Sequence, residues 1–279
     1  MTGDASPVRC SIPCNVCGAE NGEEVSTRDR DGSYLRTVIC RHCGLLWTDP
    51  RPAAQEIQDY YAQRYRLDYK STYQPKAVHL YRGGRVALER WARLKNILKL
   101  GSRVLDFGAG AGEFVYVLRA MGYDAVGIEP NEGYARFAAE TLGVPVTQGF
   151  YQDAKVAAES CDAVTLFHVL EHLEDPFHAV CCVGTWLRPG GTLVVEVPNA
   201  EAVCQWPGHR FHRAHLYNLN PITLALLFQK AGHAVRETTV SSDGGTVTVI
   251  GEKAEIPTAT VGIDPAANYE RVVSVLRGH

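Results

Sequence analysis

From residue 103 onward, short apolar runs alternate with longer segments in which apolar residues recur at helical spacing. A continuous apolar run is typical of a strand buried on both faces of a parallel sheet, and the longer segments are typical of helices that cover those faces. This alternation predicts an α/β domain built on a doubly wound sheet. The predicted strands are residues 103–106, 125–128, 145–147, 163–167 and 192–197, and the predicted helices are residues 112–121, 132–142 and 176–187.

The alternation changes at the end of this region. A helix is predicted at residues 221–232, and two strands follow at 234–240 and 246–250 with no helix between them. The run Ser-Ser-Asp-Gly-Gly that separates the two strands is a turn signal, so we predict an antiparallel hairpin. In the tail that follows, the pattern suggests a short helix at 268–276.

Residues before the alternating region have a helical pattern, with one helix predicted at 53–61 and another at 85–100. The run Asp-Pro-Arg-Pro at residues 49–52 breaks regular structure and marks a boundary. The sequence therefore predicts four parts, which are an N-terminal module at 1–52, a helical linker or cap at 53–100, the α/β domain at 101–252 and a C-terminal tail at 253–279.

Composition is that of a soluble globular protein, with 46% hydrophobic and 21% charged residues. A net charge of -3 gives no bulk attraction to nucleic acid or to an anionic membrane, so neither is expected as a partner. No apolar run approaches the roughly 18 residues of a membrane helix, and the N-terminus lacks a secretory signal pattern. Scattered and paired cysteines fit reduced thiols and a bound metal better than disulfides, so we expect a cytoplasmic protein. The sequence indicates no oligomeric state.

Two C-x2-C pairs lie within the first 45 residues, each followed by a glycine. Thiolates two residues apart in a tight turn can face one ion, and four thiolates suit tetrahedral zinc. The alternatives are chance spacing, two redox pairs or an iron–sulfur cluster with the same ligand number. Zinc ribbons usually have this spacing, and a closed four-ligand site is structural rather than catalytic. Cys10 and His42 lie nearby and are expected to be bystanders. The expected zinc ligands are Cys14, Cys17, Cys40 and Cys43.

A glycine-rich turn follows the strand predicted at 103–106. The strand ends in Asp106, and Gly108, Gly110 and Gly112 lie between it and the next helix. Glycines let the backbone approach a ligand closely, so this turn predicts a nucleotide-cofactor site. The turn by itself does not separate a methyl donor from NAD or FAD, because dinucleotide-binding proteins use a similar one.

Details around the turn favour S-adenosylmethionine. Asp106 stands two residues before the first glycine, and Glu113 stands where the dinucleotide fingerprint has a glycine. Glu129 ends the next predicted strand, where its carboxylate can accept both hydroxyls of a ribose. Glu129 alone suits NAD equally well. An NAD-dependent oxidoreductase therefore stays as an alternative, disfavoured by Glu113 and by the terminal hairpin.

Four segments carry a resemblance to a known family: VLDFGAGAGEF, GIEPN, FHVLEHLEDP and LRPGGTLVVEVPN. Over about residues 80–250 the chain resembles class I S-adenosylmethionine-dependent methyltransferases. The Glu-His-Leu run at 171–173 and the segment 220–232 resemble the subgroup related to ubiquinone-biosynthesis O-methyltransferases. A zinc ribbon precedes this domain in some bacterial relatives, including sugar methyltransferases. The resemblance implies a Rossmann-like sheet of seven strands in the order 3-2-1-4-5-7-6, with strand 7 antiparallel.

The resemblance also implies a set of cofactor contacts. The glycine turn would hold the methionine portion, Glu129 the ribose, and the region of Gly149 the adenine. Many relatives have an acid after that glycine, where this chain has Phe150. The residues implied to bind the cofactor are Asp106, Gly108, Gly110, Gly112, Glu129, Pro130, Asn131, Gly149, Phe150, Phe167 and His168.

Histidines gather after the strands predicted at 163–167 and 192–197. A hydroxyl or carbon acceptor must lose a proton on methylation, and histidine titrates in the appropriate range. The first group lies where open α/β sheets bind ligands, and the second lies in a long segment that would form a substrate lid. The alternatives are neutral structural histidines, a solvated lid, or a second metal bound by Glu171, His172 and a lid histidine. The candidate bases are His168, His172, His212 and His215.

Together these observations predict methyl transfer from S-adenosylmethionine to a small-molecule acceptor. A sugar, a sugar nucleotide or a secondary-metabolite intermediate would fit, with O-methylation slightly favoured. A methyltransferase that docks on RNA or protein through its zinc ribbon is the main alternative. The ribbon has some basic character, but acidic residues balance it.

Overall fold

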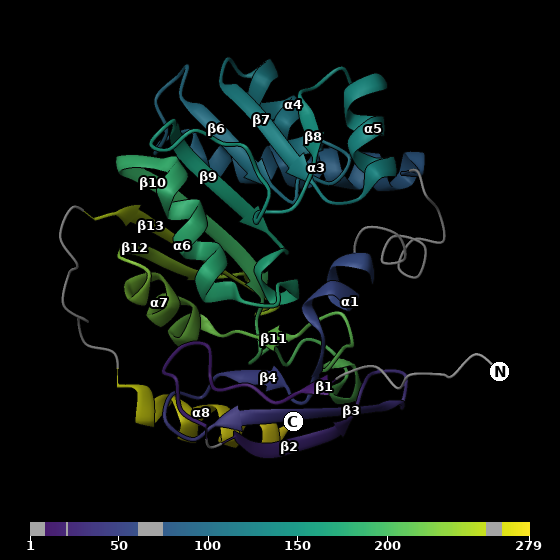
Figure 1. Ribbon diagram of the computed structural model, residues 1–279, viewed down its shortest axis with the longest axis vertical. Coiled ribbons are helices and arrows are strands. Elements are labelled where there is room, and N and C mark those ends of the chain that lie inside the picture. The colour runs from purple at the N-terminus through teal and green to yellow at the C-terminus, as the bar shows by residue number, and fades with distance from the viewer. Residues whose placement is uncertain (1–8, 21, 61–74, 255–263) are drawn as a thin grey trace.

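The computed structural model describes residues 9–20, 22–60, 75–254 and 264–279, which Figure 1 shows as ribbons. The remaining residues lie outside this description, and they include the last residue of the helix predicted at 53–61 and much of the linker after it. None of the helices in the described part of the chain has the length and apolar character that crossing a membrane requires.

Seven strands form the central sheet, in the order β12-β13-β10-β9-β6-β7-β8. Strand β13 is antiparallel to both of its neighbours, and the remaining pairs are parallel. The predicted strand order and the terminal hairpin are therefore confirmed. The strands are β6 (Arg103–Phe107), β7 (Asp124–Glu129), β8 (Val146–Gln148), β9 (Cys161–Phe167), β10 (Leu187–Pro198), β12 (His233–Val240) and β13 (Thr246–Lys253).

Helices cover both faces of this sheet (Figure 1). They are α3 (Ala77–Leu94), α4 (Glu113–Ala120), α5 (Glu132–Glu140), α6 (Pro176–Trp186) and α7 (Pro221–Lys230). Because side chains alternate along a strand, β6 contributes to two hydrophobic clusters. Leu105 packs in one cluster with Val180 of α6 and Phe228 of α7. Val104 packs in the other cluster with Leu118 of α4.

Helix α3 begins at Ala77 rather than at the predicted residue 85, and it ends at Leu94 rather than at residue 100. The first half of this helix was not predicted because it contains Gly83 and Gly84. Each glycine in a helix interior lowers helix stability by about 1 kcal/mol relative to alanine. A Cβ atom at Gly83 would lie 2.5 Å from Oε1 of Glu113 in α4. The missing side chain therefore lets α3 approach α4 closely.

The N-terminal module is built on a second sheet of four strands, in the order β11-β4-β3-β2. Its strands are β2 (Gly22–Arg28), β3 (Tyr34–Cys40), β4 (Leu46–Thr48) and β11 (Tyr217–Asn218). Strand β11 belongs to the lid segment between β10 and α7, and it pairs antiparallel with β4. A smaller pair joins β1 (Arg9–Cys10) to β5 (Arg51–Pro52), and α1 (Ala54–Asp59) follows. The lid strand in the ribbon sheet was not predicted.

The C-terminal tail forms helix α8 (Pro265–Gly278), which packs on the ribbon sheet (Figure 1). Val272 and Val273 of α8 are buried in one hydrophobic cluster with Ile39 of β3. Asn268 is also buried, and its Nδ2 donates a 2.7 Å hydrogen bond to the Cys43 carbonyl. The tail therefore covers the second cysteine pair, a role that the sequence did not show.

Hydrophobic contacts run from the ribbon into the α/β domain. Val38 and Trp47 of the ribbon belong to the same cluster of buried side chains as Leu105 of β6 and Leu216 of the lid. The division of the chain into parts at residues 52, 100 and 252 stays a prediction, and buried contacts cross the first of these boundaries.

We predict that Asn268→Ala lowers the free energy of unfolding by about 1–3 kcal/mol, because it leaves the buried carbonyl of Cys43 without a donor. Glu270→Ala on the same helix is the control. Its exposed side chain should change stability by less than about 0.5 kcal/mol. Urea unfolding of both variants measures the difference, and equal stabilities would contradict the prediction.

Candidate active site

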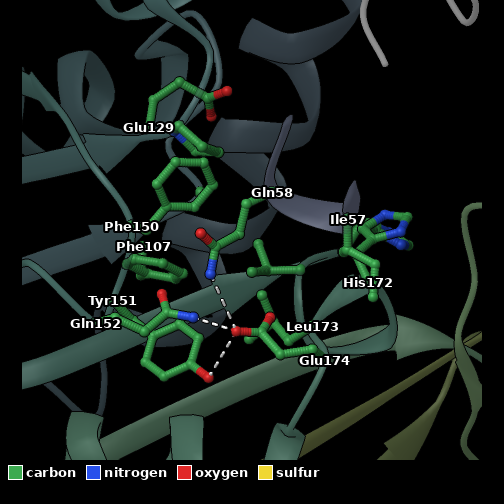
Figure 2. A pocket seen from close by; sticks show the side chains of 14 residues that line it. Ile57, Gln58, Phe107, Glu129, Phe150, Tyr151, Gln152, His172, Leu173 and Glu174 are labelled. Carbon is green, nitrogen blue, oxygen red and sulfur yellow. Dashed lines mark hydrogen bonds between the residues drawn. The ribbon is translucent and has the colours of Figure 1, made fainter. Parts of the chain in front are cut away.

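A pocket opens at the carboxyl ends of β6, β7 and β9, where the fold places ligands (Figure 2). It encloses about 630 Å³ of space between atoms, part of it open to solvent. Five of the residues predicted to bind the cofactor line this pocket, namely Gly108, Glu129, Pro130, Phe150 and His168. The other predicted cofactor residues lie in or next to the same strand ends and turns.

The glycine turn after β6 depends on left-handed backbone, with φ angles of +80° at Gly108, +58° at Gly110 and +85° at Gly112. At Gly108, which lines the pocket, a Cβ atom would lie 2.2 Å from Cγ2 of Val169. At Gly112 a Cβ atom would lie 2.9 Å from the Cβ of Ala138, so this glycine serves the packing of α4 against α5. Substitution at either position would close space that the fold needs.

Glu129 ends β7 and is 2% exposed. Its carboxylate accepts the backbone N–H of Gly110 at 2.8 Å and that of Asn131 at 3.1 Å. These two bonds fix the carboxylate between the glycine turn and the start of α5. Glu129 lines the pocket, and a carboxylate can accept hydrogen bonds from the two hydroxyls of a ribose. The pocket thus fits the nucleoside portion of S-adenosylmethionine.

Asp106 is buried beneath the turn and accepts a 2.6 Å hydrogen bond from Oγ1 of Thr165. Burial raises the pKa of Asp106 to about 7, although the Thr165 hydroxyl opposes this shift. A cationic ligand nearby would favour the ionised form of this carboxyl group. Phe167, the last residue of β9, lies beneath the guanidinium of Arg90, with 3.9 Å between the guanidinium carbon and the ring centroid.

The other side of the pocket was missed in the sequence. Ile57 and Gln58 of α1 line it, together with Glu174 from the segment after β9. Glu174 accepts hydrogen bonds from Gln58 and Tyr151, both at 3.4 Å, and from Gln152 (Figure 2). Only Tyr151 and Gln152 were foreseeable, because they follow the predicted adenine-side residues directly.

The candidate bases converge at the edge of this pocket. His168 has a left-handed backbone, with φ of 56°, which is rare outside glycine and costs about 1–3 kcal/mol. Its Nδ1 lies 3.6 Å from Oε1 of Glu171, and its Nε2 lies 3.5 Å from Oε1 of Glu196. The backbone conformation therefore places an imidazole between two carboxylates beside the cofactor pocket.

His172 forms a 2.7 Å hydrogen bond between its Nδ1 and the Ala214 carbonyl. A carbonyl oxygen only accepts, so Nδ1 carries the proton and Nε2 holds the lone pair of the neutral ring. That Nε2 lies 3.6 Å from Oε1 of Glu171. The ring centroid of His215 lies 5.0 Å from that of His172, and the ring centroid of His212 lies 5.2 Å from that of His215. The structure thus brings all four candidate histidines into one cluster.

Burial lowers the pKa of His215 to about 3 and that of His212 to about 4, so both rings are neutral at pH 7. Burial alone would raise the pKa of Glu171, but the positive charge of His172 and His168 in their protonated forms outweighs it and holds that pKa near 2. Glu171 is 2% exposed, and neither of its carboxylate oxygens has a hydrogen-bond donor in the described part of the chain. A buried, ionised carboxylate without a hydrogen-bond donor is stable only if neighbouring groups supply a positive charge or a proton.

One group within the cluster has the arrangement of a metal site. The ligand atoms of Glu171, His172 and His215 all lie within 4.8 Å of one another. A carboxylate with two imidazoles is a common ligand set for divalent transition metals. The bond from His172 to a backbone carbonyl is also the outer contact that metal-binding histidines usually make. The alternative of a second metal therefore has geometric support.

The four cysteine sulfurs of the N-terminal module also meet at one point. All lie within 4.8 Å of one another, with 3.5 Å between Cys14 and Cys43 and 3.4 Å between Cys17 and Cys40. Gly18 and Gly44 turn the chain after each pair, with φ angles of +76° and +74°. This arrangement suits a tetrahedral zinc ion and, as predicted, includes neither Cys10 nor His42.

Comparison with known sequences matches residues 79–238, more than half of the chain, to the family described as Methyltransferase domain. The chain therefore belongs to this family. The chain is 30% identical over 154 residues to a ubiquinone biosynthesis O-methyltransferase of Azorhizobium caulinodans. The aligned region covers 49% of this chain and 60% of the relative. A probable S-adenosylmethionine-dependent methyltransferase of Mycolicibacterium smegmatis is 28% identical over 139 residues, or 50% of this chain and 54% of the relative. The chain thus spans little more than half the length of these curated relatives.

Solved structures share the fold. One is a complex between the Haloferax volcanii Trm112 methyltransferase activator and a putative methyltransferase, with a TM-score of 0.54, 17% identity and coverage of 64% of this chain and 96% of that one. Another is a putative S-adenosylmethionine-dependent methyltransferase from Listeria monocytogenes, with a TM-score of 0.51, 16% identity and coverage of 61% and 100%. With the family match, they confirm the resemblance to class I S-adenosylmethionine-dependent methyltransferases.

We predict that Glu129→Gln weakens binding of S-adenosylhomocysteine by about 1.5–3 kcal/mol, because a charged acceptor for buried hydroxyls is lost. Asp124→Asn, at the exposed opposite end of β7, is the matched control and should bind normally. Calorimetric titration measures both affinities. Equal affinities in the two variants, or tight binding of NAD by the parent protein, would refute this assignment.

We predict that the four clustered cysteines hold one zinc ion. Elemental analysis should find one zinc per chain, and the double variant with Cys40→Ser and Cys43→Ser should lose it. Cys204→Ser, which changes an exposed cysteine outside the cluster, should keep the metal. Iron in place of zinc would support the iron–sulfur alternative instead.

Proposed function

We propose that this methyltransferase methylates a hydroxyl group of a small molecule. The observation that carries the proposal is the cluster of His168, Glu171, His172 and His215 at the edge of the cofactor pocket. Its imidazole nitrogens can take or orient the proton of an acceptor hydroxyl. The names of the curated relatives, which include ubiquinone biosynthesis O-methyltransferases, support a small oxygen acceptor.

S-adenosylmethionine supplies a methyl group on a sulfonium centre, which a nucleophile can take while the electron pair of the broken bond stays on sulfur. The chain's own residues would hold this group, with Glu129 on the ribose and the turn at Gly108 beside the methionine portion. Ile57 and Gln58 of α1 cover the pocket and would exclude water from it.

The base is best assigned to His168 or His172. A general base works best when its pKa is near the operating pH, and the lowered pKa values of His212 and His215 make those rings weak bases. His168 and His172 both line the cofactor pocket. The Nε2 of His172 is unprotonated in the neutral ring, and Glu171 beside it would stabilise the imidazolium that forms when it accepts the acceptor proton.

The same residues support a second route. A divalent cation held by Glu171, His172 and His215 would bind the acceptor oxygen and lower the pKa of its hydroxyl. Under this alternative Glu171 and His172 act as ligands rather than as a base and its partner. The two routes can be distinguished by experiment, because only the route through a divalent cation is sensitive to chelators.

Methylation of RNA or protein is less well supported. The basic residues of the ribbon are partly engaged in ion pairs, such as Arg36 with Glu24 and Arg41 with Glu23. Helix α8 and the lid also cover part of the ribbon sheet, which leaves less of it for a macromolecular partner. We further propose that the ribbon is structural and that its metal is zinc.

Single substitutions of the cluster separate these routes. We predict that His168→Ala or His172→Ala, whichever removes the base, lowers turnover by roughly 10²–10⁴ and leaves S-adenosylhomocysteine affinity nearly unchanged. His178→Ala, an exposed histidine on α6, is the control and should stay near the parent rate. Turnover is followed with labelled S-adenosylmethionine and the low-molecular-weight fraction of a bacterial extract.

Chelation decides between a base and a cation. Loss of turnover on dialysis against a chelator, restored by a divalent ion in the parent but not in Glu171→Gln, would establish the cation route. Label that enters only RNA or protein when whole extract is used would overturn the small-molecule proposal.

A further inference from the structure

Two carboxylates line the cofactor pocket within the described part of the chain. One is Glu129, which the proposed function places on the ribose, and the other is Glu174 from the segment after β9. In Figure 2 the ring of Phe150 lies between Glu129 and the side chains gathered around Glu174. Five further side chains of the lining are apolar, namely Ile57, Phe107, Pro130, Val169 and Leu173. The pocket therefore offers apolar surface for the faces of a flat ring and a carboxylate for its edge.

Glu174 keeps one carboxylate oxygen for a ligand. The side chains of Gln58, Tyr151 and Gln152 all donate to the same oxygen, Oε1 (Figure 2). Among the residues that the structure describes, nothing donates to Oε2 and no cation pairs with this carboxylate. Because Glu174 lines the pocket, a ligand with an N–H or O–H group at its edge can donate to the second oxygen.

The neighbours of Glu174 also favour a donor on the ligand. Gln58 and Gln152 both donate through Nε2, so their carbonyl oxygens face away from Glu174 and can serve as further acceptors. Tyr151 donates its only hydroxyl proton to Glu174. Burial, and after it the charge of Glu174, raises the pKa of Tyr151, so this hydroxyl stays protonated at neutral pH. This part of the pocket thus selects a ring edge that carries N–H groups.

The backbone around Glu174 is fixed by the N-terminal ribbon and its lid strand. The hydroxyl of Tyr217 in β11 donates to the Glu174 carbonyl at 3.3 Å. The next residue, Asp175, accepts a 2.9 Å hydrogen bond from Nδ2 of Asn15, which lies between the cysteines of the first pair. Oδ1 of Asn15 also accepts the backbone N–H of Phe177 at 2.8 Å. A carboxylate held this firmly can discriminate between ligands, because it does not move to suit a poor one.

We propose that Glu174 determines the base specificity of the cofactor pocket by accepting a hydrogen bond from the exocyclic amino group of adenine. This inference rests on the proposed function, in which Glu129 holds the ribose, and it applies to any methyl acceptor. Phe150 follows the predicted adenine-side glycine but has an apolar ring without an acceptor, so Glu174 supplies the carboxylate from the other side of the pocket. A base with a carbonyl oxygen in place of the amino group would set that oxygen against the carboxylate and bind less tightly.

Calorimetry on the full chain tests the proposal with S-adenosylhomocysteine and S-inosylhomocysteine, whose base has a carbonyl oxygen where adenine has the amino group. The parent protein should bind the adenine compound at least roughly tenfold more tightly, because a site built around an acceptor rejects a ligand without the donor. Glu174→Gln should weaken the adenine compound roughly tenfold and bind the hypoxanthine compound as tightly as the parent or more so, because its amide can donate to the carbonyl oxygen.

Asp153→Asn is the matched control. It makes the same charge change one residue beyond Gln152, at an exposed position that does not line the pocket, so it should keep the parent's preference for adenine. A loss of local structure in Glu174→Gln would weaken both ligands alike, whereas loss of the proposed contact changes the ratio of the two affinities.

Three outcomes would overturn the proposal: equal binding of the two ligands by the parent, equal weakening of both by Glu174→Gln, or the same change of ratio in Asp153→Asn. Each of these leaves methyl transfer standing as long as the parent binds S-adenosylhomocysteine. If the parent does not bind that ligand, the proposed function itself fails and this inference fails with it.

Discussion

The pairing of β11 with β4 is the contact on which the placement of the lid against the N-terminal ribbon depends. Two residues of the lid, Tyr217 and Asn218, complete the ribbon sheet opposite Trp47 and Leu46. Backbone ladders are specific in register, so this short pairing fixes how the lid and the ribbon lie against each other. It holds the lid histidines beside β9 and the turn between β2 and β3 beside the end of β10. The ribbon is therefore packed into the α/β domain rather than attached as a separate appendage.

The α/β domain was largely predictable because each of its features has a local cause. Continuous apolar runs mark buried strands, and the Ser-Ser-Asp-Gly-Gly run marks the only predicted hairpin. The glycine turn and Glu129 were found because a ligand that approaches the backbone needs glycine, and a ribose needs an acceptor. The cysteine cluster was found because metal ligands are spaced by geometry rather than by sequence context.

What escaped prediction depends on contacts between segments that are distant in the chain. Strand β11 is two residues long and has no pattern of its own, and its partner strand lies in the ribbon. Gly83 concealed the first half of α3 in the sequence. This glycine is explained by a contact with another helix, because a side chain at this position would collide with the carboxylate of Glu113 in α4. The wall formed by Ile57 and Gln58 likewise follows from how α1 lies over the pocket, and nothing in the short helix itself indicates this.

The hydrogen bond from Asn268 to the carbonyl of Cys43 joins residues 225 positions apart. During synthesis the ribbon strands emerge first, yet the sheet lacks β11 until the lid has been made and lacks its cover until α8 has been made. Contacts of such long range are slow to form, and exposed strand edges are prone to pair with other chains in the meantime. A metal bound early at the cysteine pairs would hold the unfinished ribbon together through that interval, so zinc supply during translation would influence how much of the newly made chain reaches its folded state.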